Sequence, residues 1–255
     1  MTDTLSINEK SVRRNAHGQI VHELGERIVR GDFPADHGLP NESDLGVELG
    51  VSRTIIREAI KTLSAKGMIS SRPKTGTRVL DRKHWNMLDS DVLKWISTVG
   101  NFQEFAPSLF EIRRIVEPAA AAIAAERAAP EAISRIQAAF DGMAAAGEDV
   151  EAGVEPDVRF HQAILSATDN VFLAPLGALI ESALATSFQL QRSNPGAIRN
   201  SLPQHKAVLE AIVRGDAEGA SNELRKLLVD AATDYRSVIA GSNDDGTSTD
   251  NDRGR

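Results

Sequence analysis

Residues 39–60 read LPNESDLGVELGVSRTIIREAI, and this stretch decides how the N-terminal part of the chain folds. Asn41 can begin a short helix, because asparagine is a favoured N-cap that accepts a hydrogen bond from the first turn. Gly50 tolerates the left-handed backbone of a tight turn and would end that helix. Ser52 can then cap a second helix. Two short helices joined by a turn of about four residues predict a helix-turn-helix.

The second helix of this pattern has two different faces. At about 100° per residue, its apolar residues gather on one side: Ile55, Ile56, Ala59, Ile60 and Leu63. Arg53, Arg57 and Lys61 recur every four residues on the other side. Arginine in the first turn of such a helix can reach guanine O6 and N7 in the major groove or grip a phosphate. We therefore expect one face to be buried and the cations to meet DNA; the alternative is a solvated face without a specific partner.

A small hairpin is predicted directly after this helix. Residues 68–71 and 77–80 read as two short strands, and Pro73-Lys-Thr-Gly76 reads as the turn between them. Three cations lie in or beside that turn: Arg72, Lys74 and Arg78. The hairpin is thus a basic wing suited to phosphates or a minor groove.

The stretch from Leu39 to Val79 resembles the GntR family of bacterial winged-helix transcription regulators. The resemblance depends on Leu39-Pro-x-Glu42, Gly50-Val-Ser-Arg53, Arg57-Glu-Ala59 and Gly76-Thr77. It implies a set of DNA-contacting positions, to which we add the N-cap serine of the second helix. The resulting candidates are Ser43, Ser52, Arg53, Thr54, Arg57, Lys74, Thr75 and Gly76. Ser43 stands where relatives commonly carry an arginine.

Length and charge divide the chain into two parts. Its 255 residues suffice for two domains, each with its own core. The net charge is −7, but residues 1–82 hold 13 Lys+Arg against 11 Asp+Glu, which gives +2 there and −9 in the remainder. DNA affinity would therefore come from a local basic patch and fall steeply with salt.

Several classes of protein are excluded by composition. The chain has no cysteine, so disulfides and thiolate zinc sites cannot form. No apolar run approaches the roughly 20 residues of a membrane span. Residues 1–6 lack the basic-then-apolar order of a signal peptide. We expect a cytoplasmic protein with no membrane partner.

The periodicity predicts a mainly α protein, with an N-terminal winged helix-turn-helix and a C-terminal antiparallel bundle of six or seven helices. The predicted parts are a flexible arm (1–16), the winged helix-turn-helix DNA-binding domain (17–82), a linker (83–100), an all-helical effector-binding domain (101–240) and a disordered tail (241–255). Both tryptophans, Trp85 and Trp95, lie in the linker. They would either pack the two domains together or anchor the linker to one core.

The helical part resembles the effector (FCD) domain of the FadR-type branch of the GntR family. The resemblance depends on Glu111-Ile-Arg-Arg-Ile-Val-Glu-Pro118, Asp157-x-x-x-His161, Asn170 and the segment from His205 to Asp216. The segment Trp85–Trp95 is similar to that of galactonate-operon repressors and other sugar-acid regulators of this family. The resemblance therefore covers about residues 18–240.

Asp157 and His161 lie four residues apart, on the apolar face of one predicted helix, and would be carried into the bundle. Burying them unpaired would cost several kcal/mol. In many relatives this pair and two more histidines bind a divalent metal; His205 fits the third ligand position, and Leu227 occupies the fourth. The resemblance thus implies one divalent metal (Zn, Ni or Mn) at an incomplete site. The alternative is a metal-free hydrogen bond between Asp157 and His161.

An anionic effector could bind at the same place. Arg113 matches the arginine that holds a ligand carboxylate in relatives, with a salt bridge to Glu117 as the alternative. Ser201 is a further candidate contact. The effector-binding candidates are therefore Arg113, Asp157, His161, Ser201 and His205.

These features together predict a ligand-responsive repressor. It would bind a palindromic operator as a homodimer and release it when a small carboxylate, an aldonate or a related acid, enters the bundle. The alternatives are a metal-dependent enzyme that uses Asp157, His161 and His205, or an architectural DNA binder with an inert helical domain.

Overall fold

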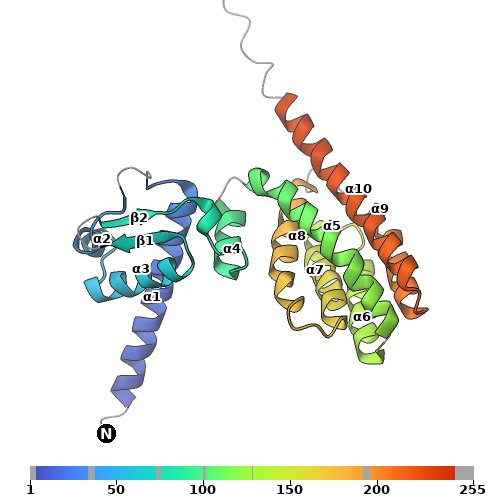
Figure 1. The fold of residues 1–255 in the computed structure, drawn as a ribbon, viewed down its shortest axis with the longest axis horizontal. Coiled ribbons are helices and arrows are strands. Elements are labelled where there is room, and N and C mark those ends of the chain that lie inside the picture. The colour runs from blue at the N-terminus through green and yellow to red at the C-terminus, as the bar shows by residue number, and fades with distance from the viewer. Residues whose placement is uncertain are drawn as a thin grey trace, which may run out of the picture. The chain divides into compact units, whose positions relative to one another are not determined.

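The computed structural model describes residues 4–33, 38–72, 76–99, 102–127, 129–191 and 196–244. The side chains of residues 4–15, 102–103, 185–191, 196–200 and 238–244 are not described. The chain divides into two compact units, Met1–Phe102 and Gln103–Arg255 (Figure 1). Helices dominate both units, so the predicted mainly α fold is confirmed.

The first unit opens with the long helix α1, Thr4–Arg30. Residues 4–16, predicted as a flexible arm, form the first turns of this helix in the structure. No proline interrupts them, and a helix that is already formed gains one backbone hydrogen bond for each residue added. Ile20, Leu24 and Ile28 are buried on its inner face.

The two helices of the predicted helix-turn-helix are α2, Glu42–Glu48, and α3, Arg53–Ala65. The Asn41 side chain caps α2 by accepting hydrogen bonds from the backbone N–H groups of Ser43 and Asp44. Gly50 adopts φ +66° in the turn. The hydroxyl of Ser52 caps α3 by accepting from the backbone N–H of Ile55. The local signals in the sequence therefore predicted this motif correctly.

The wing follows α3 as two antiparallel strands, β1 (Ile69–Arg72) and β2 (Gly76–Val79). Ile69 pairs with Val79 and Arg72 pairs with Gly76, which fixes the register of the hairpin. The tip of the wing, residues 73–75, lies outside the described residues.

The segment predicted as a linker is a folded part of the first unit. It forms a short 3-10 helix, η1 (Arg82–His84), and the helix α4 (Ser90–Val99). Trp95 is 1% exposed, and its indole N–H donates to Nδ1 of His22 on α1 at 2.7 Å. The Trp85 indole N–H donates to the carbonyl of Leu80 at 2.9 Å. Both tryptophans thus make these bonds within the first unit, as one of the two alternatives expected.

Gly25 lets α1 approach Trp95 closely. A Cβ atom added at Gly25 would lie 2.6 Å from Cε3 of the Trp95 ring. We expect Gly25→Ala to destabilise this unit by about 1–3 kcal/mol, because the rigid indole must shift. Gly18→Ala is the control, since an added Cβ there meets nothing within 4 Å. Alanine has the higher helix propensity, so this control should be neutral or stabilising by up to about 1 kcal/mol.

Urea unfolding followed by tryptophan fluorescence measures this difference, because both tryptophans of the chain lie in the first unit. Equal stability of the Gly25→Ala and Gly18→Ala proteins would show that α1 and Trp95 are not in tight contact.

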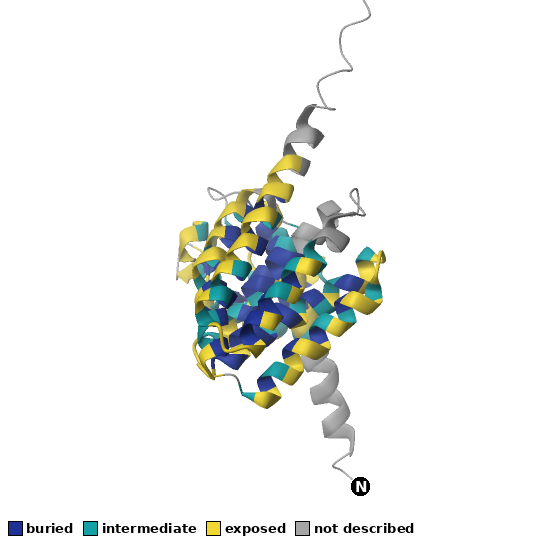
Figure 2. Ribbon diagram, turned by 90° about the vertical axis from the view of Figure 1, so that its right-hand side faces the viewer, coloured by how far each residue is buried: buried dark blue, intermediate teal, exposed yellow. Residues whose placement is uncertain are grey.

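The second unit contains six described helices. They are α5 (Phe102–Arg127), α6 (Pro130–Ala146), α7 (Val150–Ala167), α8 (Gly177–Gln191), α9 (Gly196–Val213) and α10 (Ala217–Asp244), with the 3-10 turn η2 (Ala174–Leu176) before α8. Their inward faces are buried and their outward faces exposed (Figure 2). The core of this unit includes Ile136, Phe160, Ile164 and Leu224. None of the described helices is both long and apolar enough to cross a membrane.

The C-terminal boundary also differs from the prediction. Helix α10 continues past residue 240 to Asp244. Residues 245–255, the rest of the predicted disordered tail, lie outside the described residues.

Candidate functional site

Two arginines on α3 lie at the surface that the sequence assigned to DNA. Arg53 is exposed, and its Nη2 donates to the hydroxyl of Ser43 on α2 at 2.6 Å. The Arg57 side chain is 60% exposed, and its guanidinium binds the Glu42 carboxylate, with Nη2 to Oε2 at 2.8 Å and Nε to Oε2 at 3.1 Å. Each guanidinium is therefore oriented by α2 yet accessible from outside.

Glu42 is a residue that the sequence reasoning did not assign to this surface. Its hydrogen bond and its charge raise the pKa of Arg57, so this side chain remains a cation. A surface ion pair of this kind contributes little to stability because water screens it, so a phosphate or a base edge can take over the guanidinium. The sequence signal for Glu42 was its place in the Leu39-Pro-x-Glu42 motif.

The other residues predicted to contact DNA differ in their exposure and in their hydrogen bonds. Thr54 is exposed on α3, whereas the Ser52 hydroxyl already accepts from the Ile55 N–H at 3.4 Å as the helix cap. Gly76 is exposed with φ +76° at the start of β2. Lys74 and Thr75 lie outside the described residues. The contacts of all these residues with DNA remain predictions.

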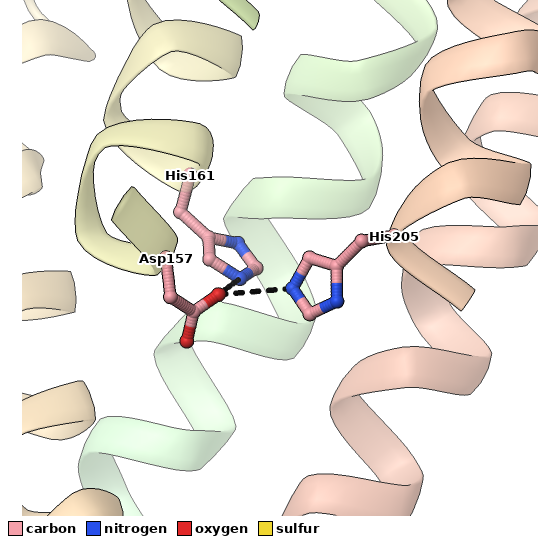
Figure 3. Close-up of side chains that lie close together, drawn as sticks. All are labelled: Asp157, His161 and His205. Carbon is pink, nitrogen blue, oxygen red and sulfur yellow. Dashed lines mark ion pairs between the residues drawn. The ribbon is translucent and has the colours of Figure 1, made fainter. Parts of the chain in front are cut away.

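The second unit buries a polar cluster among its apolar core residues. Figure 3 shows three of its side chains, which lie close together. Asp157 and His161 come from α7 and His205 from α9. Oδ1 of Asp157 lies 2.9 Å from Nε2 of His205 and 3.4 Å from Nε2 of His161. All three side chains are buried, and one potential ligand atom from each lies within 4.8 Å of the others. The structure thus brings together the three residues that the sequence proposed as metal ligands.

The outer nitrogens of both imidazoles are held by acceptors. Nδ1 of His161 lies 2.5 Å from Oε2 of Glu117, and Nδ1 of His205 lies 2.8 Å from the backbone carbonyl of Ser201. Each histidine therefore donates its Nδ1–H outward and, when neutral, turns an unprotonated Nε2 toward Asp157. Such bonds from the outer ring nitrogen are typical of histidines that bind metals.

Three acceptors that face one another require a cation or a proton between them. Oδ1 of Asp157 and Nε2 of His205 are buried without a hydrogen-bond partner, although they lie close together. One carboxylate and two imidazoles form a donor set that suits zinc, nickel or manganese. The residues present therefore fit three of a metal's coordination positions.

Two features limit metal binding at this site. Leu227, at the predicted fourth ligand position, is 4% exposed and belongs to the apolar core, so it offers no ligand atom. Nη2 of Arg113 lies 3.4 Å from Nε2 of His161, so the guanidinium and a metal would compete for the same nitrogen. Any metal here would keep positions open for water or effector oxygens.

Arg113 is paired within the protein, as the alternative expectation held. Its Nε lies 2.5 Å from Oε1 of Glu117, and the two side chains are 2% and 1% exposed. Nη1 of Arg113 is buried without a hydrogen-bond partner. Glu117 thus joins the arginine to His161, a role that the sequence did not reveal. Ser201 is half-buried on α9, and its contact with an effector remains a prediction.

A narrow cleft reaches Arg113 from the side of α8. It is lined by Ile112, Val116, Glu117, Leu176, Leu179 and Ile180 in addition to the arginine, and its cavity volume is about 10 Å³. That is room for about one water molecule. A larger ligand can reach Arg113 by this route only if these helices move apart.

The ionisable groups of the cluster stabilise one another's charges. Burial opposes the imidazolium, but the negative charge of Glu117 and hydrogen bonds to Asp157 and Glu117 outweigh it and raise the pKa of His161 to about 9. Burial likewise opposes the Glu117 carboxylate, but Arg113 and His161 lower its pKa to about 2. The pKa of Asp157 is also far below its usual value, because its interactions with His161 and His205 outweigh burial. Without a metal, the cluster therefore holds a proton on His161.

This proton predicts a pH dependence of the metal-free protein. A pKa raised from 6.5 to about 9 contributes stability that is fully present below pH 6.5 and is lost as the pH rises through 9. We expect chelator-treated protein to lose stability over this interval, as measured by urea unfolding with circular dichroism. His161→Gln should abolish this loss, whereas His84→Gln, at an exposed position, should retain it. A His161→Gln protein with the wild-type slope would contradict the assignment of the proton.

A winged helix joined to an all-helical unit with a buried polar cluster defines a class of two-domain DNA-binding regulators. Comparison with known families agrees: residues 16–79 match the bacterial regulatory proteins of the gntR family, and residues 108–230 match the FCD domain. The chain belongs to the GntR family, in the branch that carries an FCD domain. It is a DNA-binding transcription regulator and not an enzyme.

Individual relatives span nearly the whole chain. The galactonate operon transcriptional repressor of Escherichia coli K12 is 36% identical over 207 residues, which are 81% of this chain and 90% of the repressor. The uncharacterized HTH-type transcriptional regulator YieP of the same bacterium is 33% identical over 226 residues, or 88% of this chain and 97% of YieP. A structure of Lar, which controls expression of the Listeria monocytogenes agr system, has the same fold, with a TM-score of 0.60 and 21% identity over 86% of this chain and 96% of that one.

Proposed function

We propose that this regulator is a repressor whose operator affinity is controlled by a small carboxylate bound in the helical unit. The observation that carries the proposal is the buried cluster around Arg113, Asp157, His161 and His205, which leaves an arginine nitrogen, a carboxylate oxygen and an imidazole nitrogen unpaired in an apolar interior. Unpaired buried polar atoms are costly, and a bound anion with a divalent metal would satisfy them.

The chemistry of the cluster favours an acid as the effector. Arg113 has a buried Nη1 to donate, and guanidinium recognises carboxylate in a bidentate way. A metal held by Asp157, His161 and His205 would supply a Lewis-acidic centre for ligand oxygens. The similarity to a galactonate operon repressor supports an aldonate or a related sugar acid.

The small size of the cleft supports a coupling between effector binding and DNA binding. Because the space of about 10 Å³ beside Arg113 holds no more than about one water, an effector would bind only a conformation in which α5 and α8 have separated. A ligand with different affinities for two states shifts the balance between them. We propose that the opened state holds the DNA-binding units in a spacing that does not match the operator.

The operator would be palindromic and the protein a homodimer, since one recognition helix reads too few bases for useful specificity. The site of action would be the bacterial cytoplasm, where the operator DNA is.

A titration tests the proposal directly. DNA from upstream of the protein's own gene is bound in a gel shift at low salt, and D-galactonate and other aldonates are added with and without chelator. An acid that raises the melting temperature should also release the DNA, because a ligand that binds only the folded state stabilises it. Failure to bind any such DNA would contradict repression. DNA binding that no acid changes would favour the architectural alternative.

A further inference from the structure

A second cavity lies on another face of α5, away from the histidine cluster. It is a groove between residues 107–115 of α5 and residues 232–236 of α10, with a volume of about 380 Å³. Small-molecule sites commonly have volumes of about 300–1,000 Å³. The groove lies entirely within the second unit, and neither the metal ligands nor Arg113 line it.

The groove contains a buried hydroxyl that lacks a partner. Tyr235 is 8% exposed, and its hydroxyl has no hydrogen bond among the described residues. Its ring packs against Phe110, with centroids 5.2 Å apart and planes tilted by 49°. An unpaired buried hydroxyl is destabilising, because it has given up its hydrogen bonds to water. Burial also raises the pKa of Tyr235, so the phenol keeps its proton and is a donor.

Two arginines line the same groove. Arg114 and Arg236 are exposed, one on each helix, and Arg236 uses its Nε to donate to the carbonyl of Ala232 at 3.1 Å. The described lining contains one acid, Glu111, against these two cations. Ile115, 64% exposed, adds an apolar wall. Phenol and guanidinium donors suit anionic oxygens, whereas Phe110 and Ile115 suit a hydrocarbon body.

We propose that this groove binds a small organic carboxylate with an apolar body, at a site distinct from the histidine cluster. The carboxylate would accept from Tyr235 and pair with Arg114, and the apolar body would lie against Phe110 and Ile115. Consecutive residues of α5, Arg113 and Arg114, thus serve two different sites. Because both sites share α5, a ligand in the groove would act on the same helix as an effector in the interior.

Calorimetric titration of the full chain tests the site with benzoate as the probe, in the presence of chelator. Benzamide has the same shape without the charge, and inorganic phosphate has charge without an apolar body. We expect benzoate to bind, and benzamide and phosphate to bind at least about tenfold more weakly, since each lacks a charge-assisted bond or the apolar contact.

Variants then locate the site. Tyr235→Phe, which keeps the ring, and Arg114→Gln should each weaken benzoate binding by about tenfold, the effect of losing one hydrogen bond to a charged group. Arg225→Gln, at an exposed position on α10 outside the groove, should not change it, and neither should His205→Gln in the interior cluster.

Three results would overturn the proposal. One is no benzoate binding at any accessible concentration. Another is binding that survives Tyr235→Phe and Arg114→Gln but is lost in His205→Gln, which would place the probe in the interior. The third is binding that appears only when the protein is diluted, because the groove would then be a contact between two copies of the chain. None of these measurements uses DNA, so their failure leaves the proposed repression untouched.

Discussion

Replacing Glu117 with glutamine is expected to destabilise the helical unit by about 3–5 kcal/mol, the usual cost of leaving one partner of a buried ion pair alone. Glu117 and Arg113 are 1% and 2% exposed, so bulk solvent cannot replace the lost carboxylate. The same substitution also removes the negative charge beside Nδ1 of His161. Thermal unfolding followed by circular dichroism measures the loss.

The chain offers a matched control at the surface. Glu155 and Arg159 form an ion pair with the same four-residue spacing, but their side chains are 73% and 63% exposed. Glu155→Gln should therefore cost less than about 1 kcal/mol. The double substitution Arg113→Met with Glu117→Leu should recover much of the stability lost in Glu117→Gln, since apolar residues of similar volume often replace a buried pair without loss. If Glu117→Gln reduced the stability no more than Glu155→Gln does, the Glu117 carboxylate would not be buried away from solvent.

Local features of the fold could be predicted from the sequence because their causes are local. The side chains of Asn41 and Ser52 bond to backbone N–H groups two or three residues away, and Gly50 has the positive φ that its type and place suggested. The role of the segment 83–100 could not be predicted in this way. It depends on Trp95 meeting His22 and Gly25, residues that lie some seventy positions earlier in the chain.

The buried cluster likewise contains contacts that local spacing predicted and contacts that it could not predict. The four-residue spacing of Asp157 and His161 placed both on one helical face, and the structure carries that face inward. The approach of His205 was implied only by family resemblance, because α7 and α9 are separate in sequence. The contact of Glu117 with His161 joins residues 44 positions apart and requires the packing of α5 against α7. From helical periodicity alone, the only partner that could be predicted for Glu117 was Arg113, on the same helix.

Removing the two cations at the start of α3 is expected to weaken DNA binding more than any other pair of surface changes. An arginine that reads a base contributes about 1–3 kcal/mol, so Arg53→Ala with Arg57→Ala should cost about 2–6 kcal/mol if the two act independently. That is a loss of at least about thirtyfold in affinity. Fluorescence anisotropy with labelled DNA from upstream of the protein's own gene, at one fixed salt concentration, measures it.

The contacts of the two arginines within the protein make the outcome informative. Arg53 bonds to Ser43 and Arg57 to Glu42, so both are held in place before DNA arrives. Lys61 lies one turn beyond Arg57 and pairs with Glu58. Lys61→Ala should weaken DNA binding less than the arginine substitutions do, and by a similar factor for all DNA sequences. Lys226 is an exposed cation of the helical unit, so Lys226→Ala should leave the DNA affinity unchanged. If the double arginine variant bound DNA as tightly as the wild type, the two guanidinium groups would only bond to residues of α2. The DNA-contacting surface of this regulator would then have to lie elsewhere.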